Sequence, residues 1–366
     1  MTAPQPLTAG APRPPSEVYD VALLDLDGVV YVGADAVPGV ADALAAARRA
    51  GMRLGFVTNN AARSPEGVAE HLTELGVPAR AEDVITSSQA AATVVAELLS
   101  PGARVLAVGG AGVAAALTAA GLEVVERAED EPAAVVQGYG QDVGWAQLAE
   151  AVVAVRNGAR HVATNLDATI PSPRGPLPGN GAMVGVVSAV TGQQPLVTGK
   201  PDPAMHAECV RRTGARRPLV VGDRLDTDIE GARRAGAASL VVLTGVTDPG
   251  TLLAARPDQR PDLLSADAGG LLTAHPAVIT EGPAHRCGGW RVSPAEADDV
   301  LLLEAGGDGD GDGDGDGDGL DGLRALCVAH WARHPDDGAP ARVVASGEHA
   351  VAALREWGLV PDGTAV

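Results

Sequence analysis

The chain has 366 residues, which is enough for two or three domains with separate cores, and it carries a formal net charge of −20. Such an acidic chain repels nucleic-acid phosphates and anionic headgroups, so we expect neither nucleic acid nor a membrane as a partner. The three cysteines are too widely spaced for a disulfide framework or a zinc site, and no apolar run is long enough to cross a bilayer. These features predict a cytoplasmic protein.

The first buried strand of the chain ends in acidic residues. Residues 1–17 are rich in Pro and Ala and predict a disordered tail, and the unbroken apolar run Val21–Leu24 then predicts a strand of a parallel sheet. Because side chains alternate along a strand, Asp25 and Asp27 point the same way, and Gly28 allows the backbone N–H groups after them to approach a ligand. Two crowded carboxylates favour a bound Mg²⁺ ion. Taken alone, an ordinary Asp turn explains this pattern equally well.

The second predicted strand ends in small polar residues. A helix over Pro38–Ala50 leads to a buried strand over Met52–Val57, which is followed by Thr58, Asn59 and Asn60. Hydroxyl and backbone N–H groups at the end of a strand can hold phosphoryl oxygens. An Asx turn is again the structural alternative.

A second α/β unit is predicted between residues 101 and 191. Its G-x-G-x-x-A stretch, Gly110–Ala115, follows a strand and precedes a helix, as in dinucleotide-binding folds. A dinucleotide site also needs an acidic residue at the end of the next strand, whereas Glu129 and Asp130 lie in a loop, which argues against such a site. The polar loop Thr164–Gly181 is too long for a simple connection and could supply substrate contacts.

Two further strand ends carry charged residues. Lys200 follows an apolar strand and is the single lysine among 27 basic residues, all the others being arginine. A compact ammonium suits a phosphate where a planar guanidinium does not fit. The predicted strand Pro218–Val221 ends in Gly222 and Asp223, and Asp228 follows five residues after Asp223.

Together these motifs resemble the haloacid dehalogenase (HAD) superfamily, and more narrowly its subclass IIA phosphatases. The motifs are Asp25-x-Asp27-Gly28, Thr58-Asn59-Asn60, Gly199-Lys200-Pro201 and Asp223 with Asp228, supported by Thr164-Asn165-x-Asp167 and Pro178-Gly179-Asn180-Gly181. The resemblance implies an α/β fold with a Rossmann-like parallel-sheet core over residues 18–87 and 194–274. It also implies an inserted α/β cap of the C2 type over residues 88–193.

The resemblance assigns a role to each motif residue. Asp25 is expected to attack phosphorus and form an aspartyl-phosphate, and Asp27 to act as general acid and base. The implied Mg²⁺ is bound by Asp25, the backbone carbonyl of Asp27 and Asp223, with Asp228 orienting metal-bound water. The implied substrate-binding residues are Gly28, Thr58, Asn59, Asn60 and Lys200, with Asn165 and Asp167 from the cap.

The region 277–366 differs in character from the rest. Its predicted elements are a strand Val300–Glu304, a helix Leu320–His334, a strand Ala341–Ala345 and a helix Ala350–Trp357. The order resembles a shortened acetyltransferase-type (GNAT) fold, but the loop that would cradle coenzyme A pyrophosphate is absent. We therefore expect a structural, oligomerising or regulatory module. The Asp-Gly repeat in residues 306–319 predicts a disordered acidic loop and not a Ca²⁺ site.

The combination of such a tail with a subclass IIA phosphatase resembles a mycobacterial type of phosphatase and implies glycerol 3-phosphate as the substrate. The residues themselves indicate only a small organic phosphate monoester. Phosphoglycolate, pyridoxal phosphate, a sugar phosphate or a nucleotide are alternatives, and so is a non-catalytic regulator that binds a phosphorylated metabolite. An acetyltransferase with an accessory phosphatase-like domain is the remaining hypothesis. The chain could form a homo-oligomer through the cap or the tail.

Overall fold

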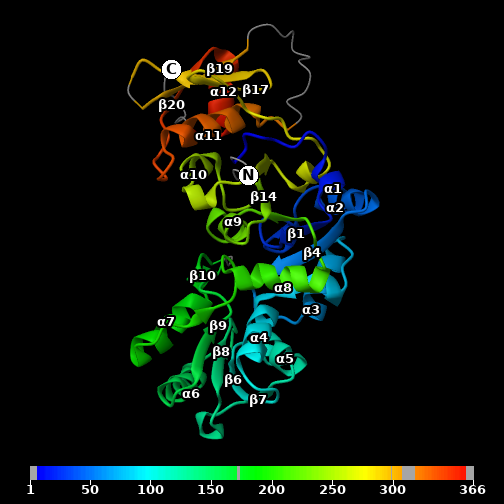
Figure 1. The fold of residues 1–366 in the computed structure, drawn as a ribbon, viewed down its shortest axis with the longest axis vertical. Helices are drawn as coiled ribbons and strands as arrows, with labels where there is room; N and C mark the ends of the chain where they lie inside the picture. The colour runs from blue at the N-terminus through cyan, green and yellow to red at the C-terminus, as the bar shows by residue number, and fades with distance from the viewer. Residues whose placement is uncertain (1–5, 171–173, 298, 307–317, 360–366) are drawn as a thin grey trace. The chain divides into compact units, whose positions relative to one another are not determined.

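The computed structural model describes residues 6–170, 174–297, 299–306 and 318–359. The chain forms two compact units (Figure 1). The first contains Met1–Val32, Ala36–Arg53 and Arg217–Val366, and the second contains Gly33–Asp35 and Leu54–Arg216. No helix within the described ranges is both long and apolar enough to span a membrane.

A parallel sheet carries the acidic strand ends of the first unit. Its strands lie in the order β15 (Leu263–Ser265), β14 (Ala238–Val242), β13 (Pro218–Gly222) and β1 (Val21–Asp25). Every residue of β1 is buried, as predicted for a strand in a parallel sheet. β1 and β13 are paired in parallel with Leu24 opposite Val221, so both strands end at the same edge. The helices of this part are α1 (Pro15–Val18), α2 (Val40–Arg49), α9 (Glu230–Arg234) and α10 (Pro249–Leu253).

The described part of the N-terminal segment is ordered, which differs from the predicted disordered tail. Leu7 is 2% exposed in an apolar cluster of the first unit, and Ala11 exchanges two backbone hydrogen bonds of 2.8 Å with His275. Pro and Ala suggested disorder because they are common in flexible segments. The segment is ordered here because its apolar side chains and backbone groups find partners far along the chain. Residues 1–5 lie outside the described part.

The C-terminal region forms a five-stranded sheet with helices packed on it. The strand order is β16 (Ile279–Glu281), β17 (Ala284–Cys287), β18 (Trp290–Pro294), β19 (Leu301–Ala305) and β20 (Val343–Ser346). The helices are α11 (Asp321–Arg333) and α12 (Glu348–Glu356), and α11 lies between this sheet and α10 (Figure 1). β19, α11, β20 and α12 confirm the predicted order of elements, whereas the antiparallel strands β16 to β18 were not predicted. Residues 307–317, which include most of the predicted Asp-Gly loop, lie outside the described residues.

The C-terminal region shares one hydrophobic core with the parallel sheet. Leu252 and Leu264 from the first part of the unit pack in the same buried cluster as Leu303, Leu323 and Leu326 from the second. Burial of apolar surface across this boundary stabilises both parts together. The C-terminal region is therefore a structural continuation of the unit and not a tethered module.

Two buried arginines connect the same two parts by hydrogen bonds. Arg260 donates to the backbone carbonyls of Ala255 at 3.1 Å, His334 at 2.5 Å and Asp337 at 2.9 Å. Its guanidinium carbon also lies 5.4 Å from the centre of the Trp331 ring.

Arg324 also links the two parts, but this arginine lies in the C-terminal region and donates to the part that holds the parallel sheet. This residue of α11 donates to the backbone carbonyl of Leu264 at 2.6 Å. The same guanidinium also pairs with Asp318 and Asp321. Asp318, the last acidic residue of the Asp-Gly repeat, is therefore held by Arg324.

The second unit is built around a parallel sheet covered by helices on both faces (Figure 1). The order is β12 (Leu196–Val197), β9 (Arg160–Ala163), β8 (Ala134–Gln137), β6 (Arg104–Val108) and β7 (Glu123–Val125). α4 (Ser87–Leu98) and α5 (Ala111–Ala119) cover one face, and α6 (Trp145–Arg156) and α7 (Asn180–Thr191) cover the other. Because β12 belongs to this sheet, the sheet extends beyond the predicted cap boundary at residue 193.

The second unit has further elements outside this sheet. They are β4 (Arg53–Thr58) and β5 (Val84–Thr86), which pair in parallel, with α3 (Pro65–Glu74), α8 (Pro203–Thr213) and the hairpin of β10 (Thr169–Ile170) and β11 (Leu177–Pro178). Ser64 caps α3, with its hydroxyl accepting from the N–H of Gly67 at 3.4 Å.

The glycines of the G-x-G-x-x-A stretch allow two segments of backbone to pack closely. A Cβ on Gly110 would lie 2.7 Å from the Cα of Ala62, and one on Gly112 would lie 2.5 Å from the carbonyl oxygen of Ala61. The N–H of Gly112 also donates to the carbonyl of Ala62 at 3.2 Å. The N-terminal end of α5 is therefore occupied by the chain's own backbone, which explains the motif without a dinucleotide.

Candidate active site

Three carboxylates meet at the edge where β1 and β13 end. Asp25, Asp223 and Asp228 each offer an oxygen, and these oxygens lie within 4.8 Å of one another. Asp25 is 9% exposed, and Asp223 and Asp228 are each 1% exposed. Buried carboxylates at such distances repel unless a cation compensates them, and carboxylate oxygens are the ligands that hard divalent ions prefer. The cluster therefore fits a divalent metal ion.

Glycines leave the space in which these carboxylates fit. A Cβ on Gly28, whose φ is +83°, would lie 2.3 Å from Oδ2 of Asp223. A Cβ on Gly245 would lie 2.0 Å from the same atom, and one on Gly222 would lie 2.2 Å from the Cβ of Asp228. Gly28 was predicted to bring its backbone close to a ligand, and in the structure it also makes room for Asp223. Any side chain at these positions would displace the cluster.

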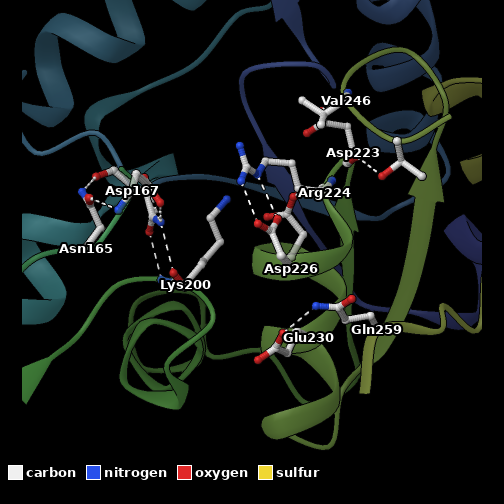
Figure 2. Close-up of polar contacts among 12 residues, drawn as sticks. Asn165, Asp167, Lys200, Asp223, Arg224, Asp226, Glu230, Val246 and Gln259 are labelled. Atoms are coloured by element: carbon white, nitrogen blue, oxygen red, sulfur yellow. Dashed lines mark hydrogen bonds and ion pairs between the residues drawn. The ribbon is translucent and has the colours of Figure 1, made fainter. Parts of the chain in front are cut away.

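Hydrogen bonds from the backbone orient the two carboxylates that follow β13. Oδ2 of Asp223 accepts the N–H of Val246 at 2.7 Å, as Figure 2 shows, and Oδ2 of Asp228 accepts the N–H of Arg224 at 3.2 Å. The turn Leu225–Ile229 precedes α9 and brings Asp228 back beside Asp223. Asp228 was expected to orient metal-bound water. The structure places its carboxylate with the other two.

Arg224 and Asp226 lie on the same loop but face one another. The guanidinium donates to both carboxylate oxygens of Asp226 at 3.1 and 2.9 Å, and both side chains are exposed (Figure 2). Their side chains are therefore occupied with one another and not with the carboxylate cluster.

Asp27 is not one of the three clustered carboxylates. It is exposed, whereas its neighbours Leu26 and Gly28 are buried. The N–H of Gly28 donates to the carbonyl of Tyr31 at 2.8 Å and closes the turn that presents Asp27. An exposed carboxylate beside a buried one suits a group that exchanges protons with a substrate and with water.

The end of β4 forms a second polar site, which belongs to the second unit. Thr58 is 4% exposed, and its hydroxyl oxygen accepts the N–H of Asn60 at 3.0 Å. The side chain of Asn60 accepts the N–H of Ala62 at 2.9 Å, which fixes the turn. These contacts order the segment that was predicted to hold a phosphoryl group.

The side chain of Asn59 binds the backbone of Lys200. Its Oδ1 accepts the N–H of Lys200 at 2.9 Å, and its Nδ2 donates to the carbonyl of Lys200 at 3.2 Å. Nδ2 also lies 3.5 and 3.4 Å from the carboxylate oxygens of Asp167. The structure therefore brings together the predicted residues Asn59, Asp167 and Lys200.

Asn165 was predicted to contact the substrate, but it is 2% exposed. Its Nδ2 donates to the carbonyl of Asn59 at 2.7 Å, and its Oδ1 accepts the N–H of Asp167 at 3.1 Å (Figure 2). Asn180, at the start of α7, donates to the carbonyl of Asn165 at 2.8 Å. No role was predicted for Asn180, although its Pro-Gly-Asn-Gly motif supported the family resemblance. The sequence feature that could have identified Asn180 is an asparagine between two glycines, directly before an apolar helical run.

Family models match three parts of the chain. A haloacid dehalogenase-like hydrolase model matches residues 22–123, and a HAD-hydrolase-like model matches residues 197–269. A GCN5-related N-acetyltransferase-like domain model matches residues 287–359. The matches contain the acidic strand ends, Lys200 and, in the C-terminal region, strands β18 to β20 with helices α11 and α12.

Curated relatives and solved structures extend over most of the chain. D-glycerol 3-phosphate phosphatase of Mycobacterium tuberculosis is 44% identical over 94% of this chain and 96% of its own length. Acid sugar phosphatase of Staphylococcus aureus is 40% identical over 63% of this chain and 88% of its own length. Crystal structures of a glycerol phosphate phosphatase from M. tuberculosis are also similar. The calcium complex has a TM-score of 0.85 at 42% identity and covers 96% of this chain and 100% of that one. The magnesium complex has a TM-score of 0.83 at 43% identity, with coverages of 95% and 99%.

The chain belongs to the haloacid dehalogenase-like hydrolases. Within that family it is a phosphoric monoester hydrolase, with a Rossmann-like parallel-sheet core and a C-terminal GNAT-like domain. The family, fold class and type of enzyme predicted from the sequence are thereby confirmed. A divalent metal ion is a cofactor of this class, and small phosphorylated metabolites are its substrates.

Proposed function

We propose that this protein is a Mg²⁺-dependent phosphatase that hydrolyses glycerol 3-phosphate through an aspartyl-phosphate on Asp25. The observation that carries the proposal is the cluster of Asp25, Asp223 and Asp228 at the ends of two adjacent parallel strands. A nucleophile in that position is held by a rigid sheet, and its charge is compensated by the metal that the cluster fits.

The first chemical step breaks the phosphate ester. A carboxylate oxygen of Asp25 forms a bond to phosphorus while the bond from phosphorus to the ester oxygen breaks. Asp27 gives its proton to the departing alkoxide, which leaves as an alcohol. In the second step Asp27 takes a proton from water, the water oxygen forms a bond to phosphorus, and the bond from phosphorus to the Asp25 oxygen breaks, which releases inorganic phosphate and restores the Asp25 carboxylate.

The remaining residues of the site bind the phosphoryl group and compensate its charge. Asp25, Asp223 and the backbone carbonyl of Asp27 would hold Mg²⁺, with Asp228 beside them. When bound, the ion supplies positive charge that stabilises the phosphoryl oxygens. The hydroxyl of Thr58, the N–H groups of Asn59 and Asn60 and the ammonium of Lys200 would hold the transferring group.

Glycerol 3-phosphate is proposed as the substrate because the similarity to the M. tuberculosis phosphatase covers the GNAT-like domain as well as the hydrolase region. Similarity to the S. aureus acid sugar phosphatase supports a sugar phosphate as the alternative. Phosphoglycolate, pyridoxal phosphate and nucleotides complete the set to be tested. A regulator that only binds such a metabolite would have no need of the proton donor Asp27.

We further propose the organisation in which these residues act. Residues 88–193 form the inserted cap, and residues 18–87 with 194–274 form the catalytic core. The enzyme acts in the cytoplasm, without a nucleic-acid or membrane partner, and the cap or the GNAT-like domain can mediate a homo-oligomer.

Phosphate release from a panel of substrates tests the proposal. Purified protein with Mg²⁺ would be assayed on glycerol 3-phosphate, phosphoglycolate, pyridoxal phosphate, sugar phosphates, nucleotides and 4-nitrophenyl phosphate. The highest kcat/KM is expected for glycerol 3-phosphate, and Asp25→Asn should abolish turnover while leaving thermal unfolding unchanged. A higher kcat/KM for another substrate would replace glycerol 3-phosphate, and no turnover of any would favour a binding regulator.

A further inference from the structure

We propose that Asn165 and Asn180 act as positioning residues for Lys200, through the side chain of Asn59, and that they do not read the leaving group. This inference rests on the proposed function, because it assigns Lys200 to the phosphoryl group. It differs from the prediction that Asn165 contacts the substrate. Asn59, Asn165, Asn180 and Lys200 all lie in the second unit, and so do all the contacts that link them.

The first link is the amide of Asn59 on the backbone of Lys200. Oδ1 accepts the N–H of Lys200 at 2.9 Å, and Nδ2 donates to its carbonyl at 3.2 Å. The opposite orientation of the amide would place donor against donor and acceptor against acceptor, so these partners fix it. Two hydrogen bonds to a single residue hold both its position and its backbone direction, from which the side chain starts.

The backbone before Lys200 is also tightly confined. A Cβ on Gly199 would lie 2.1 Å from the carbonyl oxygen of Thr164 and 2.7 Å from Oδ1 of Asn59. The N–H of Thr198 donates to the carbonyl of Ala163 at 3.1 Å and extends the pairing of β12 with β9. Lys200 is therefore anchored to the segment that leads to Asn165.

The second link holds Asn59 itself. Its carbonyl accepts from Nδ2 of Asn165 at 2.7 Å and from the hydroxyl of Ser87 at 2.6 Å. Oδ1 of Asn165 accepts the N–H of Asp167 at 3.1 Å. The side chain of Asn165 is thus committed to protein partners at both ends and is 2% exposed. A buried amide of this kind positions its neighbours rather than contacting a ligand.

The third link holds Asn165. Nδ2 of Asn180 donates to the carbonyl of Asn165 at 2.8 Å and to that of Gln137 at 3.2 Å. The flanking glycines allow this approach, because a Cβ on Gly181 would lie 2.2 Å from the carbonyl oxygen of Leu166. The Pro-Gly-Asn-Gly motif therefore holds the Thr-Asn-x-Asp loop in place, and that loop in turn positions Lys200 through Asn59.

The three links predict how a substitution of Asn165 would affect catalysis. A residue that positions the phosphate-binding lysine affects every phosphate ester to the same extent, because all of them present the same phosphoryl group. A residue that reads the leaving group affects some esters and not others. The two roles therefore differ in their dependence on the leaving group.

The test compares Asn165→Ala and Asn180→Ala with the wild type and with Asn157→Ala, an exposed asparagine at the end of α6. We expect Asn165→Ala to lower kcat/KM about 10-fold for glycerol 3-phosphate, phosphoglycolate and 4-nitrophenyl phosphate alike. Calorimetry with inorganic phosphate and Mg²⁺ should show a similar loss of affinity. Asn180→Ala should act in the same direction, and Asn157→Ala should change neither quantity. A loss confined to one ester, or unchanged phosphate affinity, would overturn the proposal.

A double-mutant cycle with Lys200→Ala tests the route of the effect. If Asn165 acts through Lys200, Asn165→Ala should cost less than about 2-fold in the Lys200→Ala background. If the double mutant loses activity by the product of the two single-mutant factors, Asn165 acts independently of Lys200, and this would contradict the proposed links. If the wild type binds phosphate without turnover, the proposed function fails. The same cycle, measured by phosphate affinity, then still decides the role of Asn165.

Discussion

Removal of the Arg260 guanidinium should destabilise the whole first unit. Arg260 is 6% exposed, and it donates to three backbone carbonyls, of which those of His334 and Asp337 lie across the boundary with the GNAT-like domain. Arg260→Met keeps the apolar stem but leaves those carbonyls without their charged donor, at about 1 kcal/mol each, and removes a cation–π contact with Trp331 worth about 1 kcal/mol. We therefore expect the free energy of unfolding to fall by about 3–4 kcal/mol.

Urea unfolding monitored by two signals measures this effect. Trp290, Trp331 and Trp357 report on the GNAT-like domain by fluorescence, and loss of Mg²⁺ binding reports on the carboxylate cluster. Both signals should change at the same urea concentration, and Arg260→Met should lower both midpoints together. Arg291→Met is the control, because its ion pair with Glu304 is solvent-exposed and worth less than about 1 kcal/mol. An equal effect of the two substitutions, or separate midpoints, would refute the shared core.

Three further predictions concern the site and the second unit. Gly28→Ala should weaken Mg²⁺ binding at least about 10-fold in calorimetry, because the new Cβ would lie 2.3 Å from Oδ2 of Asp223; unchanged affinity would contradict the assigned metal site. Lys200→Arg should lower kcat/KM about 100-fold although the charge is kept, since a guanidinium cannot replace a compact ammonium here; near-normal turnover would refute that requirement. Burial lowers the pKa of His161 to about 4, so the unfolded state binds its proton more readily, and stability should fall as the pH drops from about 6.5 to about 4. His161→Gln should reduce that pH dependence by about 2 kcal/mol in unfolding experiments at pH 7 and pH 4.5, and an unchanged slope would contradict a neutral buried imidazole.

The acidic strand ends could be predicted because they depend on short-range rules. Apolar runs define the parallel strands, parallel strands end at a common edge, and the residues after them are therefore neighbours. This reasoning placed Asp25 and Asp223 together, and the structure brings their carboxylates within reach of one ion. The phosphate-binding role of Lys200 stays a prediction, which rests on its being the single lysine among 27 basic residues.

The functions of the asparagines could not be predicted in the same way. An asparagine at a strand end can bind a ligand, a backbone group or nothing, and the choice depends on segments more than a hundred residues away. Asn59 meets Lys200 across 141 positions and Asn165 across 106. The sequence shows that such side chains are polar and follow predicted strands, but only the fold shows that they bind one another.

Packing between distant segments also escaped prediction elsewhere. The glycines at 110 and 112 matched a nucleotide-binding pattern because close backbone approach has the same requirement whether the neighbour is a pyrophosphate or the chain itself. The ordered structure of residues 6–17 likewise depends on partners remote in sequence. The same holds for the hydrophobic core that the parallel sheet shares with the GNAT-like domain.

The arginine-only background has a practical consequence for spectroscopy. Reductive methylation with ¹³C-formaldehyde modifies amines and leaves guanidinium groups untouched, so Lys200 would be the single labelled side chain of the protein beside its terminal amine. One isolated methyl resonance would then follow the proposed phosphate-binding lysine without assignment of a crowded spectrum. Its chemical shift would respond to phosphate, metal and pH at one known atom in a chain of 366 residues.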